Sequence, residues 1–214
     1  MLFRSAQLPG IKSPFDEQSP VLSPDGSVMY FTVTGHPENM MGKRDPGDIW
    51  AAVKTPDGWT APEAQLQWNN SSYNAVIGIS DSGNEIFLVG HYNSDGTAAQ
   101  AQGFSVSRRT ATGWSRPEKV YIPYYSNRTP AAGAMVAPAG DVFIYSATAP
   151  LSLGAEDLFI SARRDDGWSE PVHLGNQINT PFQELSPAVS ADGKTIWFSS
   201  NRPGTAGSFD IYRS

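Results

Sequence analysis

The phrase Gly58-Trp59-Thr60-Ala61-Pro62 returns twice in this chain, as Gly113-Trp114-Ser115-Arg116-Pro117 and as Gly167-Trp168-Ser169-Glu170-Pro171. The three tryptophans lie 55 and 54 residues apart. Self-similarity at a fixed period indicates that one supersecondary unit is built repeatedly, with each copy burying its apolar face against the next. The phrase therefore decides the architecture of the chain before any single residue is considered.

A second phrase keeps step with the first and has the chemistry of a tight turn. A proline or small residue, then Asp or Ser, then Gly stands between two apolar stretches, and the glycines are spaced 57, 57 and 53 residues apart. Gly favours the left-handed position that follows such a turn. The four copies are Ser23-Pro24-Asp25-Gly26, Ser80-Asp81-Ser82-Gly83, Ala137-Pro138-Ala139-Gly140 and Ser190-Ala191-Asp192-Gly193.

Short β-branched and aromatic runs follow these turns, and they are too short for helices. They cover residues 28–31, 86–89, 142–145 and 196–198. A third strand is predicted to start near residues 48, 103, 157 and 210, and an outer strand follows each Gly-Trp phrase. Four-stranded sheets repeated radially are β-propeller blades. The predicted fold class is therefore all-β, a β-propeller of four-stranded antiparallel blades with about four repeats.

The last repeat carries a family resemblance. The stretch Glu184 to Gly204, which contains Ser190-Ala191-Asp192-Gly193-Lys194, followed by Asp210-Ile211-Tyr212, closely resembles the WD40-like (PD40) propeller repeat. That repeat occurs in TolB-type proteins and in bacterial envelope proteins that join such propellers to an OmpA-like peptidoglycan-binding domain. The resemblance implies a propeller fold and a periplasmic or outer-membrane-associated location. Its members differ in activity, so it implies little about chemistry.

We expect one propeller domain over residues 1–214, with an outer-strand remnant at 5–13 and repeats at about 14–66, 70–122, 127–175 and 181–214. Two explanations of the ends stay open. The N-terminal strand completes the fourth blade of a closed ring, or the chain is part of a longer propeller with further blades or an OmpA-like domain. The second is favoured, because the chain breaks inside a repeat at both ends.

Composition excludes several functions. The net charge is −6 and there is no run of Lys or Arg, so nucleic acid and anionic membrane surfaces are poor partners. The absence of cysteine excludes disulfides and thiol catalysis. No apolar run approaches the roughly 18 residues that a membrane span requires. We expect no membrane span and no nucleic-acid partner.

Catalytic patterns are equally scarce. The chain has three histidines, no His-Glu-x-x-His pattern and no Gly-x-Ser-x-Gly elbow. We expect no catalytic residues, no resident metal and no cofactor, although His36 and His91 could join acidic residues in a metal site. The repeated tryptophans 59, 114 and 168 are expected to be core between blades. The aspartates 48, 157 and 210 are expected to bond loop backbone.

The best candidates for recognition lie outside the repeat consensus. Loops between second and third strands, and connections between repeats, carry aromatic residues beside Asn and Arg, which are residue types that dominate binding energy. The candidate ligand-binding residues are His36, Lys43, Arg44, Trp68, His91, Tyr92, Tyr124, Tyr125, Asn127, Arg128, Asn201 and Arg202.

The expected function is a non-catalytic propeller module of the bacterial cell envelope that recognises a protein or glycan through one loop-rich face. The alternative is the propeller of a carbohydrate-active enzyme, a TolB-like lyase or hydrolase, or the substrate-gating propeller of a prolyl-oligopeptidase-like peptidase.

Overall fold

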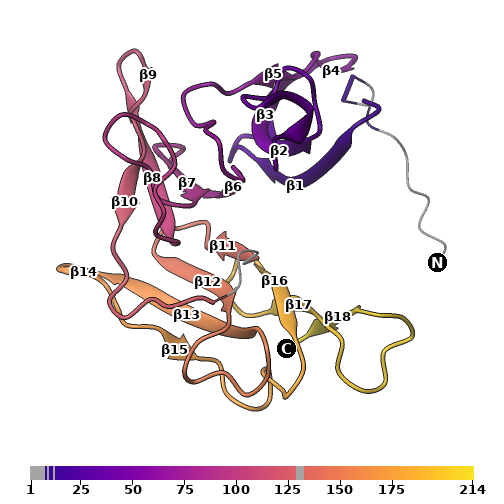
Figure 1. Cartoon of the computed structure of the whole chain (residues 1–214), viewed down its shortest axis with the longest axis vertical. Helices are drawn as coiled ribbons and strands as arrows, with labels where there is room; N and C mark the ends of the chain where they lie inside the picture. The colour runs from indigo at the N-terminus through magenta and orange to yellow at the C-terminus, as the bar shows by residue number, and fades with distance from the viewer. Residues whose placement is uncertain (1–7, 9, 12, 129–132) are drawn as a thin grey trace. The chain divides into compact units, whose positions relative to one another are not determined.

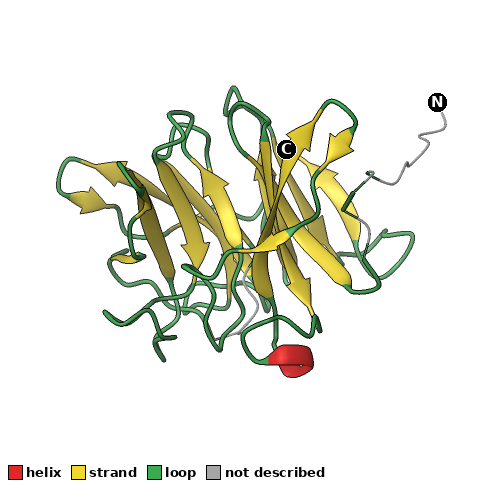
Figure 2. Ribbon diagram, turned by 90° about the horizontal axis from the view of Figure 1, so that it is seen from above, coloured by secondary structure: helices red, strands yellow, loops and turns green. Residues whose placement is uncertain are grey.

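The computed structural model describes residues 8, 10, 11, 13–128 and 133–214, and part of the expected N-terminal strand (residues 5–7, 9 and 12) lies outside them. Within the described residues the strands form four antiparallel sheets in chain order, which are β-propeller blades, as predicted (Figure 1). Loops and turns join the strands, and the one helical turn in the described part of the chain is a short 3-10 segment, η1 (Gly42–Arg44) (Figure 2). No helix among the described residues is long and apolar enough to cross a bilayer.

The chain divides into two compact units. The first contains residues up to Ile79 with Gly83–Ala101 and Ser105–Glu118, and the second contains Ser80–Ser82, Gln102–Phe104 and Lys119–Ser214.

The first sheet has the strand order β1-β2-β3-β4, with β5 also paired to β3. It is drawn in indigo and purple in Figure 1. Its strands are β1 (Asp16–Leu22), β2 (Val28–Thr34), β3 (Asp48–Thr55), β4 (Gly58–Trp59) and β5 (Glu63–Ala64).

The second and third sheets repeat this plan. The second has the order β10-β8-β7-β6 with β9 paired to β8, and the third has β11-β12-β13-β14 with β15 paired to β13. The strands of the second are β6 (Val76–Ile79), β7 (Glu85–Val89), β8 (Phe104–Thr110), β9 (Gly113–Trp114) and β10 (Glu118–Val120). Those of the third are β11 (Ala134–Val136), β12 (Val142–Ala147), β13 (Asp157–Arg164), β14 (Gly167–Trp168) and β15 (Val172–His173).

The fourth sheet has three strands in the order β16-β17-β18. They are β16 (Glu184–Val189), β17 (Ile196–Ser200) and β18 (Asp210–Arg213). All four predicted second-strand runs fall inside β2, β7, β12 and β17. The glycines of the four predicted turns have φ between 66° and 73°, which confirms the left-handed position that required Gly.

The Gly-Trp phrase is explained by a hairpin that each of the first three sheets repeats. In the third sheet Arg164 pairs with Gly167, so the loop has two residues, and Gly167 has φ 132°. The Ser169 N–H donates to Ala162 O (2.8 Å), while the Ala162 N–H donates to Ser169 Oγ (3.0 Å). Thr60 and Ser115 make the same pair of bonds in their sheets. The hydroxyl, two residues before the proline, thus accepts a hydrogen bond from a third-strand N–H. The proline itself has no N–H to continue the ladder.

Inner strands carry a recurring irregularity. The register shifts between Gln18 and Val21 in β1 and between Leu185 and Ala188 in β16. Ser19 and Ser186, with φ of 52° and 50°, occupy these bulges and each precedes a proline. A bulge is where a strand tolerates proline, because the bulged residue does not pair.

The core of the first unit joins its two sheets. Tyr30 and Ile49 from the first sheet pack with Val76 and Leu88 from the second, and Trp68 lies in the same cluster. Half-buried Trp114 packs against this cluster, with its ring centroid 5.6 Å from that of Trp68. The prediction of a core role is therefore confirmed for Trp114.

The other two repeated tryptophans also pack on apolar groups. Trp59 lies against a cluster that contains Phe31 and Trp50. Trp168 meets Phe143 edge-on at 4.5 Å in the second unit. Both indoles are half-buried, so part of each ring packs against the protein.

Candidate functional site

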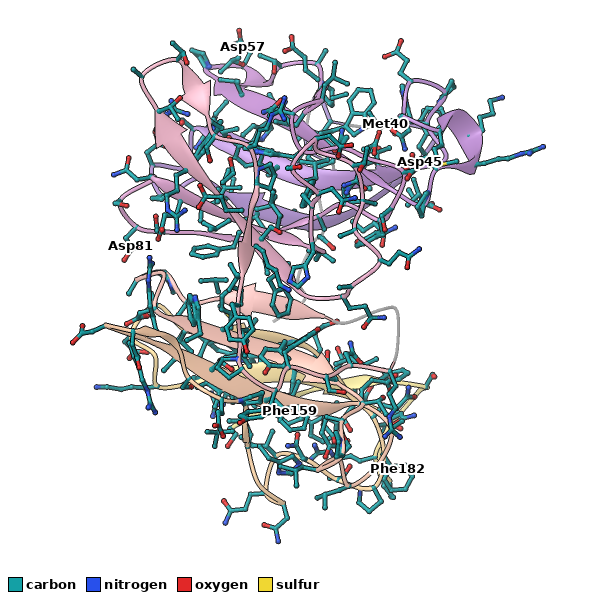
Figure 3. The ribbon with its side chains drawn as sticks, turned by 60° about the vertical axis from the view of Figure 1, so that its left-hand side comes forward. Met40, Asp45, Asp57, Asp81, Phe159 and Phe182 are labelled. Atoms are coloured by element: carbon teal, nitrogen blue, oxygen red, sulfur yellow. The ribbon has the colours of Figure 1, made fainter. Side chains whose placement is uncertain are left out.

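Aspartates at the start of three third strands hold the loops that precede them, as predicted. The Met40 N–H donates to Asp48 Oδ2 (2.7 Å), the Leu153 N–H to Asp157 Oδ2 (2.6 Å) and the Ala206 N–H to Asp210 Oδ2 (2.7 Å). Figure 3 labels Met40 on the first of these loops. The carboxylates are therefore structural acceptors, and the loops that they hold are positioned by the sheets.

Asparagines in the connections between repeats complete this arrangement. The Ile49 N–H donates to Asn69 Oδ1 (2.8 Å), and Asn69 Nδ2 donates to Ile49 O (3.0 Å). Asn179 forms the same two bonds with Leu158, at 2.8 and 2.9 Å. Each amide replaces a strand partner at the start of a third strand, so each connection is bound to its own sheet.

The second repeat has lost both groups. Gly103 stands where the other repeats have Asp. The turn that leads into the connection matches residue by residue, because Trp68, Tyr125 and Ile178 each donate their N–H to the carbonyl three residues earlier. Ser126 therefore stands where Asn69 and Asn179 stand, and it is exposed whereas both asparagines are buried.

Tyr124 lies two residues before Ser126 in this connection. It has φ 55°, and its side chain is 81% exposed. Pro123 precedes it, and a positive φ after proline is the turn position that usually requires Gly. A non-glycine residue held there costs of order 1–3 kcal/mol, and such strain is typical of functional sites.

Beneath Tyr124 lies a pocket of about 250 Å³ within the second unit. Its floor is formed by Tyr145 from β12 and Phe159 from β13, which are 1% and 2% exposed. Figure 3 labels Phe159 on the third sheet. Leu151, 67% exposed, forms part of the rim. The remaining lining residues are Ser126, Ala149, Pro150, Glu170 and Pro171.

The pocket is apolar with one acidic group at its edge. Burial raises the pKa of the Tyr145 hydroxyl, so this phenol stays neutral. Burial likewise raises the pKa of neighbouring Tyr125 to about 12, partly offset by a hydrogen bond with Asn127. Glu170 forms no side-chain hydrogen bond or ion pair within the described residues. Such a pocket suits an apolar anchor group, because rings and aliphatic carbons provide most of its surface.

Four of the predicted binding residues cluster at this pocket. Tyr124 lines it. Tyr125 packs beside it, with its ring 5.4 Å from Phe104 and 5.3 Å from Tyr145. Asn127 Oδ1 accepts the Thr148 N–H (3.0 Å), and the Arg128 N–H donates to Thr148 O (3.1 Å). The last two contacts tie the connection to the end of β12 and leave the Arg128 side chain exposed.

Three other predicted residues are buried, which corrects their assignment to a binding surface. Trp68 is fully buried between Tyr30 and Trp114. Tyr92 is 9% exposed and donates its hydroxyl to Trp68 O (2.7 Å). His91 is also 9% exposed. These side chains pack inside the first unit and are not available to a partner.

Asn201 and Arg202 form hydrogen bonds and an ion pair within the second unit. Asn201 exchanges two hydrogen bonds with Gln183. Arg202 forms an ion pair with fully buried Glu184 (3.2 Å) and donates to Ile178 O (2.6 Å). A buried carboxylate requires such a partner, so Arg202 is a structural cation.

The remaining predicted residues lie in the first unit. Lys43 and Arg44 belong to η1, are exposed and line neither of the pockets described in this article. His36 is half-buried and lines a second pocket on the first sheet. Among the described residues there is no group of three or more His, Asp or Glu side chains that could hold a metal ion.

Sequence reasoning missed the pocket floor. Tyr145 and Phe159 are ordinary strand residues of the repeat, so nothing in their pattern separates them from core. The signal that was present is the loss of Asp and Asn in the second repeat, because it marks the connection that contributes Tyr124 and Ser126 to the pocket.

The chain superposes on TolB from Acinetobacter baumannii with a TM-score of 0.57 and 13% identity, over 94% of this chain and 41% of that one. A structure assigned as TolB from Agrobacterium tumefaciens gives 0.53 and 17%, over 94% and 58%. The chain thus spans less than two thirds of either structure. At this identity the similarity shows the β-propeller fold alone. No protein-family model and no curated protein matches the chain.

Proposed function

We propose that this chain is a non-catalytic β-propeller binding module of the bacterial cell envelope, which recognises a protein or glycan partner through the surface around Tyr124. The envelope location is supported by the resemblance of the last repeat to PD40 repeats and by the fold shared with the TolB structures. The single observation that carries the binding role is the strained, exposed Tyr124 above an aromatic pocket.

The arrangement supports binding for a physical reason. An exposed aromatic ring beside a concave apolar pocket gives a partner both a stacking surface and a place for an anchor group. Tyr124 is strained and exposed at the same time, and we attribute the presence of a non-glycine residue at this turn position to function.

A substitution that separates folding from binding tests this proposal. Tyr124→Gly removes the ring and relieves the positive φ, so the variant should unfold at the same temperature or higher. It should lose at least about tenfold in affinity for the partner, because a central aromatic anchor contributes about 2 kcal/mol or more. The assay compares wild type and variant as bait in envelope extracts and on a glycan array, followed by titration of what the wild type binds.

Tyr121→Ala is the matched control. Tyr121 is also exposed, at 67%, and lies in the same segment without lining the pocket. Its removal should leave partner binding unchanged. Equal binding by wild type and Tyr124→Gly would overturn the proposal, as would loss of binding in the Tyr121 variant alone.

A further inference from the structure

A second pocket, of about 220 Å³, lies on the first sheet at positions equivalent in the repeat to those beneath Tyr124. Both sites are built by the end of a second strand, the start of a third strand, the loop between them and the proline of the Gly-Trp phrase. The equivalent lining pairs are Phe31 and Tyr145, Trp50 and Phe159, His36 and Pro150, and Pro62 and Pro171.

The first-sheet pocket differs in charge. Two carboxylates, Glu17 and Glu38, line it, and its described lining residues include no Lys or Arg. Glu17 Oε1 accepts the Ser13 N–H (3.1 Å) and the Ser13 hydroxyl. The Glu38 carboxylate forms no hydrogen bond or ion pair with any described residue. The pocket beneath Tyr124 has one carboxylate, from Glu170, at a repeat position where the first sheet has Ala61.

The aromatic wall of the first-sheet pocket is held rigidly. Trp50 Nε1 donates to Asn39 Oδ1 (3.0 Å), and Asn39 Nδ2 donates to Val33 O (2.8 Å). The His36 ring lies edge-on to Trp50, with centroids 4.4 Å apart. The Glu38 N–H donates to His36 Nδ1 (3.1 Å), which fixes the start of the loop that bears the Glu38 carboxylate. A preformed wall reduces the ordering cost of binding.

We propose that this pocket binds a positively charged organic group, namely the side chain of a Lys or Arg residue on a partner protein. Aromatic rings attract cations through their electron-rich faces, and the carboxylates of Glu17 and Glu38 complement the charge. The aliphatic stem of such a side chain would pack on the apolar lining. The net charge of −6 on the whole chain favours the approach of a basic segment. This site is independent of the one proposed beneath Tyr124.

The test titrates the isotope-labelled full chain with Nα-acetyl-lysine amide and Nα-acetyl-arginine amide, and follows amide and indole resonances. Both probes should shift the Trp50 indole signal, with dissociation constants in the millimolar range that is usual for single side chains. The uncharged analogues Nα-acetyl-norleucine amide and Nα-acetyl-citrulline amide should bind about tenfold more weakly. Equal binding of charged and neutral probes, or shifts confined to other sites, would overturn the proposal.

Charge-neutral variants supply the second arm. Glu38→Gln and Glu17→Gln should each weaken lysine-amide binding by about two- to fivefold without changing the unfolding temperature. Glu63→Gln is the control, because Glu63 is exposed in β5 of the same sheet and does not line the pocket. If all three variants bind the probe as the wild type does, the carboxylates have no role and the proposal fails. Tyr124→Gly should retain this binding, so the outcome does not depend on the function proposed above.

Discussion

The amide side chain of Asn179 does what a neighbouring strand would otherwise do, since it offers one acceptor and one donor to the main chain of Leu158. It is fully buried, so water cannot replace either bond if the side chain is lost. Buried main-chain groups without partners are costly, and this explains why an asparagine stands at this place in two repeats.

Asn179→Ala should lower the free energy of unfolding by about 1–3 kcal/mol, because it leaves the buried Leu158 N–H unsatisfied, whereas Leu158 O keeps the Leu174 N–H as a donor (3.2 Å). Chemical denaturation measures the loss. Asn176→Ala is the control, since Asn176 is exposed in the same connection and its loss should cost less than about 0.5 kcal/mol. Similar costs for the two variants would show that the Asn179 bonds contribute no net stability.

A second residue-scale effect concerns Asp48. Burial, reinforced by the nearby charge of Asp45, raises the pKa of its carboxyl to about 6, although the Met40 N–H opposes the shift. Within the described residues Oδ1 has no hydrogen-bond partner. The folded protein therefore holds a proton that the unfolded chain releases near pH 4.

The consequence is a stability that falls as pH rises from about 4 to 6, because unfolding releases the Asp48 proton over that interval. Asp48→Asn keeps an acceptor for the Met40 N–H and removes the titration. The melting temperature of the variant minus that of the wild type should therefore be larger at pH 7.5 than at pH 4.5. A difference that does not change with pH would contradict the raised pKa.

Among the elements, third strands occupy equivalent places but meet different surroundings. Ile49 in β3 is fully buried in the core of the first unit, whereas Ile211, at the same position of β18, is 78% exposed. On the neighbouring strand, Tyr30 is 8% exposed and its counterpart Trp197 is 37% exposed. Residues at equivalent repeat positions therefore contribute different amounts to the free energy of unfolding.

Ile49→Thr should cost about 2–4 kcal/mol, because it leaves a cavity and buries a hydroxyl. Ile211→Thr keeps β-branching at an exposed position and should cost less than about 0.5 kcal/mol. Denaturant unfolding of both single variants provides the comparison. A large loss for Ile211→Thr would mean that this face of β18 is covered in solution.

At the scale of the whole chain, the period of the sequence predicted the elements well. Strands and turns depend on local chemistry, such as Gly at a positive φ or a hydroxyl before proline, and this chemistry is visible in each repeat. Burial depends on what an element meets in space. Trp68 and Tyr124 both lie in connections outside the consensus, and only the structure shows that one is core and the other exposed.

The candidate site was predictable in part for the same reason. The sequence indicated the Tyr124–Arg128 connection, because its composition departs from the repeat. The pocket floor could not be predicted, since Tyr145 and Phe159 belong to the regular pattern and their shared cavity arises only when two strands and a loop assemble. The internal hydrogen bonds of Asn201 and the ion pair of Arg202 could not be predicted either. Polar loop residues show the same sequence pattern whether they bind a ligand or a buried side chain such as Glu184.

The tight hairpins between third strands and Gly-Trp phrases offer a practical advantage. Asp57 stands at such a tip, where Figure 3 labels it, and lines neither pocket. Because the natural chain has no thiol, Asp57→Cys would create a unique attachment point for a fluorophore or a spin label. A reporter placed there would signal the arrival of a ligand without occupying the surface that receives it.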